Sequence, residues 1–241
     1  MSSGDNRFRF KHFSVKQEKS AMKVGTDGVL LGAWAGIGYS PRTILDAGAG
    51  TGLIALMLAQ RFPHAYVTAV EISREAAEEC RENFDCSCWS DRMTCICSDY
   101  INLAGNETGY DLIVSNPPFF TNGIFAPEKA RAAARHSDCG MSPEKVLEKS
   151  SELLSGNGRV AMIVPAGLED SLIFKATILH LDLTRITRVS SREGKTPFRI
   201  LCEFSRISDR SFVEDSFFVR DINNNYSDGY VRLTKDFYIN F

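Results

Sequence analysis

Short apolar runs alternate with amphipathic stretches from position 43 to about position 205. The apolar runs predict seven β-strands, at 43–47, 66–72, 93–97, 111–115, 158–165, 184–191 and 199–205. Period-3.6 patterns predict helices between them, at 53–60, 74–84, 143–154 and 168–180, and Ser73 and Ser142 are expected to cap the second and third of these. Short apolar strands separated by helices are typical of a parallel sheet with both faces covered. The sequence therefore predicts an α/β protein with a seven-stranded, mostly parallel, Rossmann-like sheet.

The pattern before position 41 is different. From Arg7 to Val15, charged residues alternate with phenylalanine, which predicts a strand or an extended arm with one apolar face. We expect the phenylalanines to pack on the domain, although basic residues interleaved with rings also suit RNA. Thr26 or Asp27 is expected to cap a short helix. We predict a single domain with an N-terminal arm and helix (1–40), a catalytic core (41–206) and a C-terminal extension (207–241).

Composition is that of a globular protein. The chain has 241 residues, of which 44% are hydrophobic and 24% charged. Its first residues lack the apolar core of a signal peptide, and no run of about 18 apolar residues predicts a membrane span. We therefore expect a cytoplasmic protein that does not contact the membrane, and we infer no obligate protein partner.

The net charge of −2 conceals two basic segments. The first lies within residues 1–24, and the second consists of Arg185, Arg188, Arg192, Lys195 and Arg199. Most such charges are solvated surface residues. On an acidic protein, however, two basic segments also permit a local site for a polyanion.

The chain has seven cysteines, and five of them fall between Cys80 and Cys97. Two pairs in that interval have C-x-C spacing, whereas zinc sites more often have C-x₂₋₄-C spacing. A zinc site is therefore the alternative, and we predict reduced thiols and no metal.

A glycine-rich turn follows the first predicted strand of the core. Its pattern, Asp46-x-Gly48-x-Gly50-x-Gly52, lies where open α/β sheets bind ligands. A dinucleotide site requires G-x-G-x-x-G, but Leu53 stands where the third glycine would fall. Asp46 would also repel a pyrophosphate, while it suits a cationic ligand. S-adenosylmethionine fits these features because it carries an ammonium and a sulfonium and has no phosphate.

Two further carboxylates follow the next predicted strands. Glu71 ends the second strand, where it is expected to accept hydrogen bonds from the ribose hydroxyls. Asp99 follows the third, where it is expected to accept from the adenine amino group. Either residue alone could be a cap or a surface residue, but their joint position at the strand ends favours a cofactor site.

The stretch Asn116-Pro117-Pro118-Phe119 follows the fourth predicted strand. The two prolines hold φ at about −65° and remove two backbone N–H donors. The residue before a proline is also pushed towards extended conformations. The chain thus presents an amide, unopposed carbonyls and a ring on a stiff path, which suits a flat substrate with an NH₂ group. The alternative is a turn that merely ends a buried strand.

With these motifs the sequence resembles the class I S-adenosylmethionine methyltransferases that carry an NPPF-type motif and act on exocyclic amines. Within that class it is similar to the bacterial tRNA(Val) adenine-N6 methyltransferases, which modify adenine 37 beside the anticodon. The narrower resemblance rests on Phe10-Lys11-x-Phe13, Met22–Gly28 and the tail residues Asn225–Tyr230 and Phe237-Tyr238. Relatives often have tyrosine where this chain has Phe119, and either ring can stack on a base.

The resemblance implies a role for each part of the site. Asn116 and Pro117 would accept hydrogen bonds from the adenine NH₂ and aim its lone pair at the methyl group, while Pro118 keeps the path stiff. Phe119 would stack on the target base. The implied cofactor residues, besides the glycine loop and its carboxylates, are Lys23, Gly25, Thr26, Asp27, Ile72 and Tyr100.

RNA contacts are expected after the motif. The loop-like stretch 120–141 contains Lys129, Arg131 and Arg135, which could hold phosphates that flank the target base. The alternative is a basic turn on the surface.

Three other functions remain open at this point. The first is another NPPF enzyme, acting on rRNA guanine-N2, DNA adenine-N6 or protein glutamine, because all of these substrates present a planar NH₂. The second is an NAD-dependent oxidoreductase, which shares the sheet but lacks support in the glycine spacing. The third is a non-catalytic RNA-binding module, against which the full set of methyltransferase groups argues.

Overall fold

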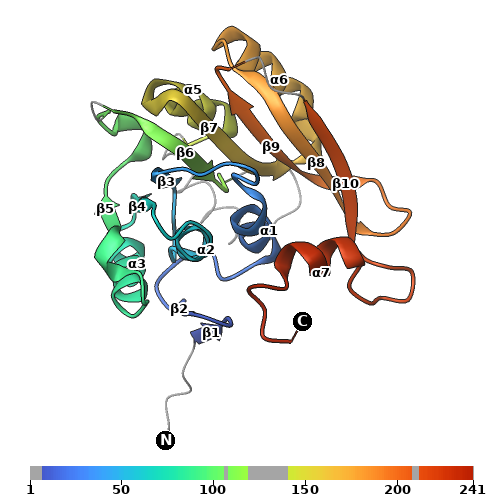
Figure 1. Cartoon of the computed structure of the whole chain (residues 1–241), viewed down its shortest axis with the longest axis horizontal. Coiled ribbons are helices and arrows are strands. Elements are labelled where there is room, and N and C mark those ends of the chain that lie inside the picture. The colour runs from blue at the N-terminus through green and yellow to red at the C-terminus, as the bar shows by residue number, and fades with distance from the viewer. Residues whose placement is uncertain (1–6, 106–107, 119–140, 208–211, 241) are drawn as a thin grey trace, which may run out of the picture.

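The computed structural model describes residues 7–105, 108–118, 141–207 and 212–240 (Figure 1). The strands are β1 (Arg7–Arg9), β2 (Ser14–Lys16), β3 (Thr43–Ala47), β4 (Tyr66–Glu71), β5 (Met93–Cys97), β6 (Tyr110–Ser115), β7 (Leu154–Pro165), β8 (Asp182–Arg192), β9 (Pro197–Ser205) and β10 (Val213–Arg220). The α-helices are α1 (Thr26–Trp34), α2 (Leu53–Arg61), α3 (Arg74–Asp85), α5 (Pro143–Leu153), α6 (Glu169–Ile178) and α7 (Asp228–Thr234). Short 3₁₀ turns lie at Ser90–Arg92, Tyr100–Asn102 and Ala166–Leu168.

The central sheet has eight strands in the order β10-β8-β9-β7-β6-β3-β4-β5, whereas the sequence predicts seven. All seven predicted strands are confirmed, and β9 is the one that runs antiparallel to its neighbours. The additional strand is β10, which comes from the predicted C-terminal extension and pairs with β8 in parallel. Its sequence, VEDSFFVR, carries charged residues in its first half and only the short apolar run Phe217–Val219, which is consistent with a strand at the edge of the sheet.

Helices cover both faces of this sheet (Figure 1). Helices α1, α2 and α3 share one hydrophobic cluster, to which α7 contributes Tyr230. Helices α5 and α6 contribute to the second cluster on the opposite face. Ser73 and Ser142 cap α3 and α5 as predicted, since each hydroxyl accepts a backbone N–H three residues on. The cap of α1 is Gly25, which makes no side-chain cap bond, so the prediction of Thr26 or Asp27 was wrong.

The N-terminal stretch is a hairpin rather than a single strand or arm. β1 and β2 pair antiparallel, and the N–H of Phe10 donates to the carbonyl of Phe13 across the turn. The rings of Phe10 and Phe13 are buried and stack with centroids 4.7 Å apart, which confirms that they pack on the domain. Phe10 also stacks on Tyr238, so the two ends of the chain meet on the α2 face of the sheet.

The cysteine-rich interval is divided between the core and the surface. Cys80 and Cys95 are buried, while Cys86, Cys88 and Cys97 are exposed. No cluster of three or more metal-ligating side chains occurs among the described residues. In the same residues, no helix combines the length and apolarity needed to cross a membrane.

Candidate active site

The neighbouring strands β3 and β6 bring the two predicted motifs together. Ala47 and Ser115 are register partners at the carboxyl ends of these strands. The buried Ser115 hydroxyl donates to the carbonyl of Ala47 at 2.8 Å and links the two strand ends. The glycine loop starts at the next residue on one strand and Asn116 follows on the other, so both motifs leave the sheet side by side.

Backbone hydrogen bonds hold the glycine loop against the end of β4. The N–H groups of Gly48 and Ala49 both donate to the carbonyl of Val70, and the N–H of Gly50 donates to Oε2 of Glu71 at 2.8 Å. A phosphate-binding loop presents such N–H groups to its ligand. Here they are engaged by the protein, so this loop is not a pyrophosphate cradle.

The loop also requires glycine where it meets α3. Gly52 has a φ of 79°, and a Cβ at this position would lie 2.6 Å from the ring of Phe84 and 2.7 Å from Sγ of Cys80. Any side chain there would therefore be strained and would also push α3 away. The close packing of α3 explains this glycine without any reference to a ligand.

Asp46 is fully buried beneath the loop. Its Oδ2 accepts the N–H of Ala55 in the first turn of α2, so a protein carboxylate already occupies the positive end of that helix. Its Oδ1 is buried and has no hydrogen-bond partner among the described residues. Burial is the main cause that raises the pKa of this carboxyl to about 7, and the negative charge of Glu71 adds to the shift. An unpaired buried carboxylate of this kind favours a cation nearby.

The remaining predicted carboxylates lie at adjacent strand ends. Glu71 uses both oxygens, because Oε1 accepts the N–H of Ser73 and Oε2 that of Gly50. Asp99 caps the turn at Tyr100–Asn102, where its Oδ1 accepts the N–H of Ile101. Each oxygen has a second lone pair, so these bonds leave acceptor capacity for a ligand.

The two apolar neighbours of these carboxylates differ in exposure. Ile72 is 45% exposed beside Glu71. Tyr100 points into the core, where its hydroxyl meets that of Ser150 at 2.7 Å. Its contribution to a ligand site would therefore come through its backbone rather than its ring.

An N-terminal loop lies beside the glycine loop and is anchored by α3. The buried carboxylate of Glu79 accepts the backbone N–H groups of Glu18, Lys19 and Ser20 at 2.5, 2.8 and 3.0 Å. The ammonium of Lys23 donates to the carbonyls of this same loop, including that of Ser20 at 3.1 Å. Lys23 is thus engaged in holding the loop in its present conformation.

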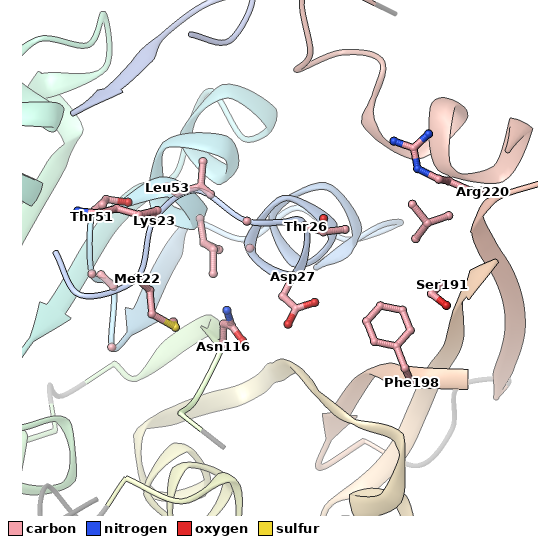
Figure 2. A pocket seen from close by; sticks show the side chains of 17 residues that line it. Met22, Lys23, Thr26, Asp27, Thr51, Leu53, Asn116, Ser191, Phe198 and Arg220 are labelled. Atoms are coloured by element: carbon pink, nitrogen blue, oxygen red, sulfur yellow. The ribbon is translucent and has the colours of Figure 1, made fainter. Parts of the chain in front are cut away.

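One cavity of about 490 Å³ joins these elements to the C-terminal strands (Figure 2). Its lining includes seven of the residues singled out from the sequence: Lys23, Gly25, Thr26, Asp27, Gly48, Gly50 and Asn116. It does not include Asp46, Gly52, Glu71, Ile72, Asp99 or Tyr100. The cavity continues past the predicted set to Ser191, Phe198, Val219 and Arg220. The structure therefore joins one part of the expected cofactor site to a region that the sequence did not single out as a site.

Asp27 and Arg199 lie between the two ends of the cavity. The carboxylate of Asp27 accepts from Nε of Arg199 at 2.9 Å, and both side chains are about one-fifth exposed. The guanidinium of Arg199 also lies 4.9 Å from the centroid of the Phe198 ring. The contact with Arg199 holds the ring of Phe198 in place. Figure 2 shows Phe198 in the wall across from Asn116.

Asn116 presents the most distinctive polar group of the cavity. Its Oδ1 is buried and accepts no hydrogen bond within the described part of the chain. A buried acceptor without a partner destabilises the protein by about 1–3 kcal/mol. A bound ligand that donates a hydrogen bond to Oδ1 would remove this cost. Pro117 is buried and Pro118 half-buried next to it. Phe119, Lys129, Arg131 and Arg135 lie outside the described residues, and their roles stay predictions.

Sequence reasoning missed several residues that shape this site. Ser115, Glu79, Phe198 and Arg220 gave no local signal, since their partners are far away in the chain. The strand at 199–205 was predicted, but nothing in its sequence indicated that Phe198, just before that range, lines the same cavity as Asn116. The burial of Glu79 contradicts the simplest expectation for an acidic residue in the charged stretch 71–85.

Comparisons with known proteins place the chain in a methyltransferase family. The family model of the methyltransferase small domain matches residues 37–182. A protein of Porphyromonas gingivalis, named tRNA1(Val) (adenine(37)-N6)-methyltransferase, is 46% identical over 96% of this chain and 94% of its own length. A protein of the same name from Flavobacterium psychrophilum is 43% identical over 96% of this chain and 99% of its own length.

Solved structures with low identity share the fold. A predicted O-methyltransferase from Agrobacterium tumefaciens has a TM-score of 0.68 at 20% identity and covers 88% of this chain and 96% of its own. A 16S rRNA N2 methyltransferase from T. thermophilus, solved with AdoMet and guanosine, has a TM-score of 0.56 at 19% identity. It covers 83% of this chain and 50% of its own.

Proposed function

Because the chain belongs to the family whose curated members are named tRNA1(Val) (adenine(37)-N6)-methyltransferase, we propose that it methylates the N6 amine of adenine 37 in tRNA(Val). The methyl donor is S-adenosylmethionine, as in other methyltransferases of this class. The observation that carries the proposal is the buried, unpartnered Oδ1 of Asn116 in the cavity wall. We also propose that this activity takes place in the cytoplasm, because its substrate would be a tRNA.

Asn116 would position the adenine amine for attack on the methyl group. The lone pair of the adenine amine is delocalised into the ring, which makes the amine a weak nucleophile. An NH₂ group that donates to Oδ1 of Asn116 and to the carbonyl of Pro117 is held with its nitrogen lone pair directed out of the ring plane. This positioning lowers the barrier by orientation and electrostatics, and it requires no strong base before transfer. The proton becomes acidic only when the nitrogen gains the methyl group.

The donor set beside Asn116 fits S-adenosylmethionine. When bound, this cofactor supplies an electrophilic methyl group on a positively charged sulfur. Asp46 supplies a buried negative charge for a cationic ligand, and Glu71 supplies acceptors at the end of β4 for hydroxyl groups. The left-handed glycines Gly48 and Gly50 let a ligand approach the backbone closely. The engaged N–H groups of the loop argue against a dinucleotide in the same place.

The far end of the cavity suits the nucleoside. Phe198 offers an aromatic wall across from Asn116, and bases stack on such rings with about 1–3 kcal/mol per base. A target base can reach Asn116 only if it leaves the stack of the anticodon loop. The combination of an aromatic wall and an amide acceptor in one cavity therefore supports a flipped base as substrate.

The test is methylation of tRNA in vitro. Purified protein is incubated with labelled S-adenosylmethionine and either total tRNA or a tRNA(Val) transcript, and the products are digested and mapped by nucleoside. We expect N6-methyladenosine at adenine 37 of tRNA(Val). The matched control is a transcript with guanine at that position, which should stay unlabelled.

Two results would contradict the proposal. Label in N2-methylguanosine, or label confined to rRNA, DNA or protein, would assign the chain to another NPPF-type reaction. Calorimetric binding of NAD without binding of S-adenosylmethionine would remove it from the methyltransferases altogether.

A further inference from the structure

The structure divides the basic segment Arg185–Arg199 into two groups. Three of its arginines are committed to internal contacts. Arg185 lies over the ring of Trp34 at 4.4 Å, and Arg188 forms ion pairs with Glu169 and Glu214. Arg199 is paired with Asp27, as described above. Their charges are therefore largely compensated by the protein, and they leave little attraction for an external anion.

Arg192 is in a different situation, because its neighbour is another arginine. It ends β8 and is the register partner of Arg220 at the end of β10. Both guanidiniums donate to the same residue: Arg192 to Oδ1 of Asn224 at 2.9 Å, and Arg220 to the carbonyl of Asn224 at 2.6 Å. The side chain of Arg220 is further held over the ring of Tyr226, at 4.1 Å.

No carboxylate forms an ion pair with either arginine among the residues that the structure describes. In the sequence, the acidic residue Glu193 follows Arg192 directly, and Asp221 follows Arg220. Asp221 accepts from the backbone and the side chain of Asn225, and the N–H of Glu193 donates to the carbonyl of Arg220. Like charges on paired strand residues repel each other. An anion bound between the two guanidiniums would relieve that repulsion.

The sheet topology brings this arginine pair to the substrate end of the cavity. β8 and β10 run parallel to β7, so their carboxyl ends lie at the same edge of the sheet as those of β3 and β6. Arg220 lines the same cavity as Asn116, with Phe198 and Ser191 between them (Figure 2). The hydrogen bond from Glu193 to Arg220 ties the β8–β9 turn to β10.

We propose that Arg192 and Arg220, the arginine pair, form a phosphate-binding subsite for the RNA backbone beside the target adenosine. This inference rests on the proposed tRNA substrate. Guanidiniums recognise phosphate oxygens through two parallel N–H donors, and each of these side chains is already oriented by Asn224. In this view β10 extends the substrate edge of the sheet, so the C-terminal extension contributes directly to RNA binding.

The test compares RNA affinity over a range of salt concentrations, without cofactor, so that methyl transfer does not enter the measurement. The protein binds a fluorescent tRNA(Val) transcript, and five variants are compared with it: Arg192→Gln, Arg220→Gln, Arg220→Lys, the double variant Arg192→Gln/Arg220→Gln and Arg42→Gln. Arg42 is the matched control, since it is exposed and precedes β3 at the opposite edge of the sheet. Thermal unfolding of each variant shows whether it is folded.

We expect the double variant to bind tRNA about tenfold more weakly, because charge-assisted hydrogen bonds are lost. The slope of log K against log salt should fall by about 0.7–0.9 for each phosphate contact removed. Arg42→Gln should change neither quantity. Arg220→Lys keeps the positive charge, so it should keep most of the salt slope. If Arg220 only packs on Tyr226, then Arg220→Lys and Arg220→Gln should weaken tRNA binding equally, and neither should change the slope.

The outcomes separate this subsite from the proposed function. A double variant with the slope of Arg42→Gln overturns the subsite even if adenine 37 is methylated. Wild-type protein that does not bind tRNA also overturns it. If the slope falls as expected but nucleoside mapping finds no N6-methyladenosine, the proposed function fails and the RNA-binding subsite stands.

Discussion

The two ends of the cavity are built in different ways. Around the cofactor end, outside the cavity lining itself, the carboxylates of Asp46, Glu71 and Glu79 accept backbone N–H groups and fix the course of the chain. At the substrate end, the guanidiniums of Arg199 and Arg220 lie over aromatic rings, and they donate to a carboxylate on α1 and to a carbonyl in the turn after β10. One end is organised by backbone geometry and the other by long side chains.

This difference predicts different responses to change. Buried hydrogen bonds to a charged acceptor contribute strongly to stability, and salt screens them little. Half-exposed guanidiniums add less to stability, but they attract anions and respond to salt. Changes at the cofactor end should therefore affect folding and cofactor affinity, whereas changes at the substrate end should affect RNA affinity.

The largest effect is expected where the two ends meet, at Asn116. Replacing Asn116 with Ala removes the acceptor that positions the amine, so methyl transfer should fall about a hundredfold or more. Affinity for S-adenosylmethionine should be nearly unchanged, because the cofactor contacts lie on other strands. Single-turnover methylation and calorimetry measure the two quantities. Near-normal turnover in this variant would remove Asn116 from the reaction.

The next largest effect is expected at Glu79, which represents the cofactor end. Glu79→Ala leaves three backbone N–H groups without their acceptor and should lower the free energy of unfolding by about 3 kcal/mol. Cofactor affinity should fall with it, since the loop of residues 17–23 loses its anchor. Denaturant unfolding is the measurement. Glu78→Gln is the control on the same helix, where exposed ion pairs contribute little.

A tenfold effect is expected at Phe198, which represents the substrate end. Phe198→Ala removes a stacking surface and should raise KM for tRNA about tenfold while cofactor affinity stays constant. Phe174→Ala on α6 is the control, because that ring is 69% exposed and away from the cavity. Equal KM values in the two variants would argue that no base contacts Phe198. Loss of cofactor binding in Phe198→Ala would contradict the prediction that the substrate end affects RNA affinity alone.

The smallest effect is a pH dependence of cofactor affinity. The folded pKa of Asp46 is about 7, raised mainly by burial, so this carboxyl is mostly protonated at about pH 5.5. A cationic ligand prefers the ionised form, so affinity should rise several-fold from about pH 5.5 to about pH 7. Calorimetry in buffers of different ionisation enthalpy should also show proton release on binding. Asp46→Asn should abolish this dependence, and an unchanged pH profile would exclude Asp46 as its source.

The same pKa shift has a consequence for stability without ligand. The folded pKa lies above the ordinary value of 3.8, so the folded protein binds more protons than the unfolded chain between these two values. The contribution of Asp46 to stability is thus fully present below about pH 4 and is lost as the pH rises through about 7.

The sequence by itself determined where the seven core strands and their helices lie along the chain, and it identified the two motifs that follow β3 and β6. Strand and helix periods, serine caps and the glycine and proline pattern are local signals, and they need no knowledge of distant partners. The same local chemistry identified Asn116 and Asp46 as functional candidates. The resemblance that these motifs carry then indicated the reaction class.

Tertiary structure decided which of many similar side chains belong to the site. Glu78, Glu79 and Glu82 share one helix, yet only Glu79 is buried and anchors a loop from the start of the chain. Arg188, Arg192 and Arg199 also share one segment. Arg188 pairs with a carboxylate of β10 and Arg199 pairs with Asp27, whereas Arg192 lies beside another arginine and can bind an external anion. Burial and charge compensation depend on contacts between residues far apart in sequence, and for that reason only the folded chain shows them.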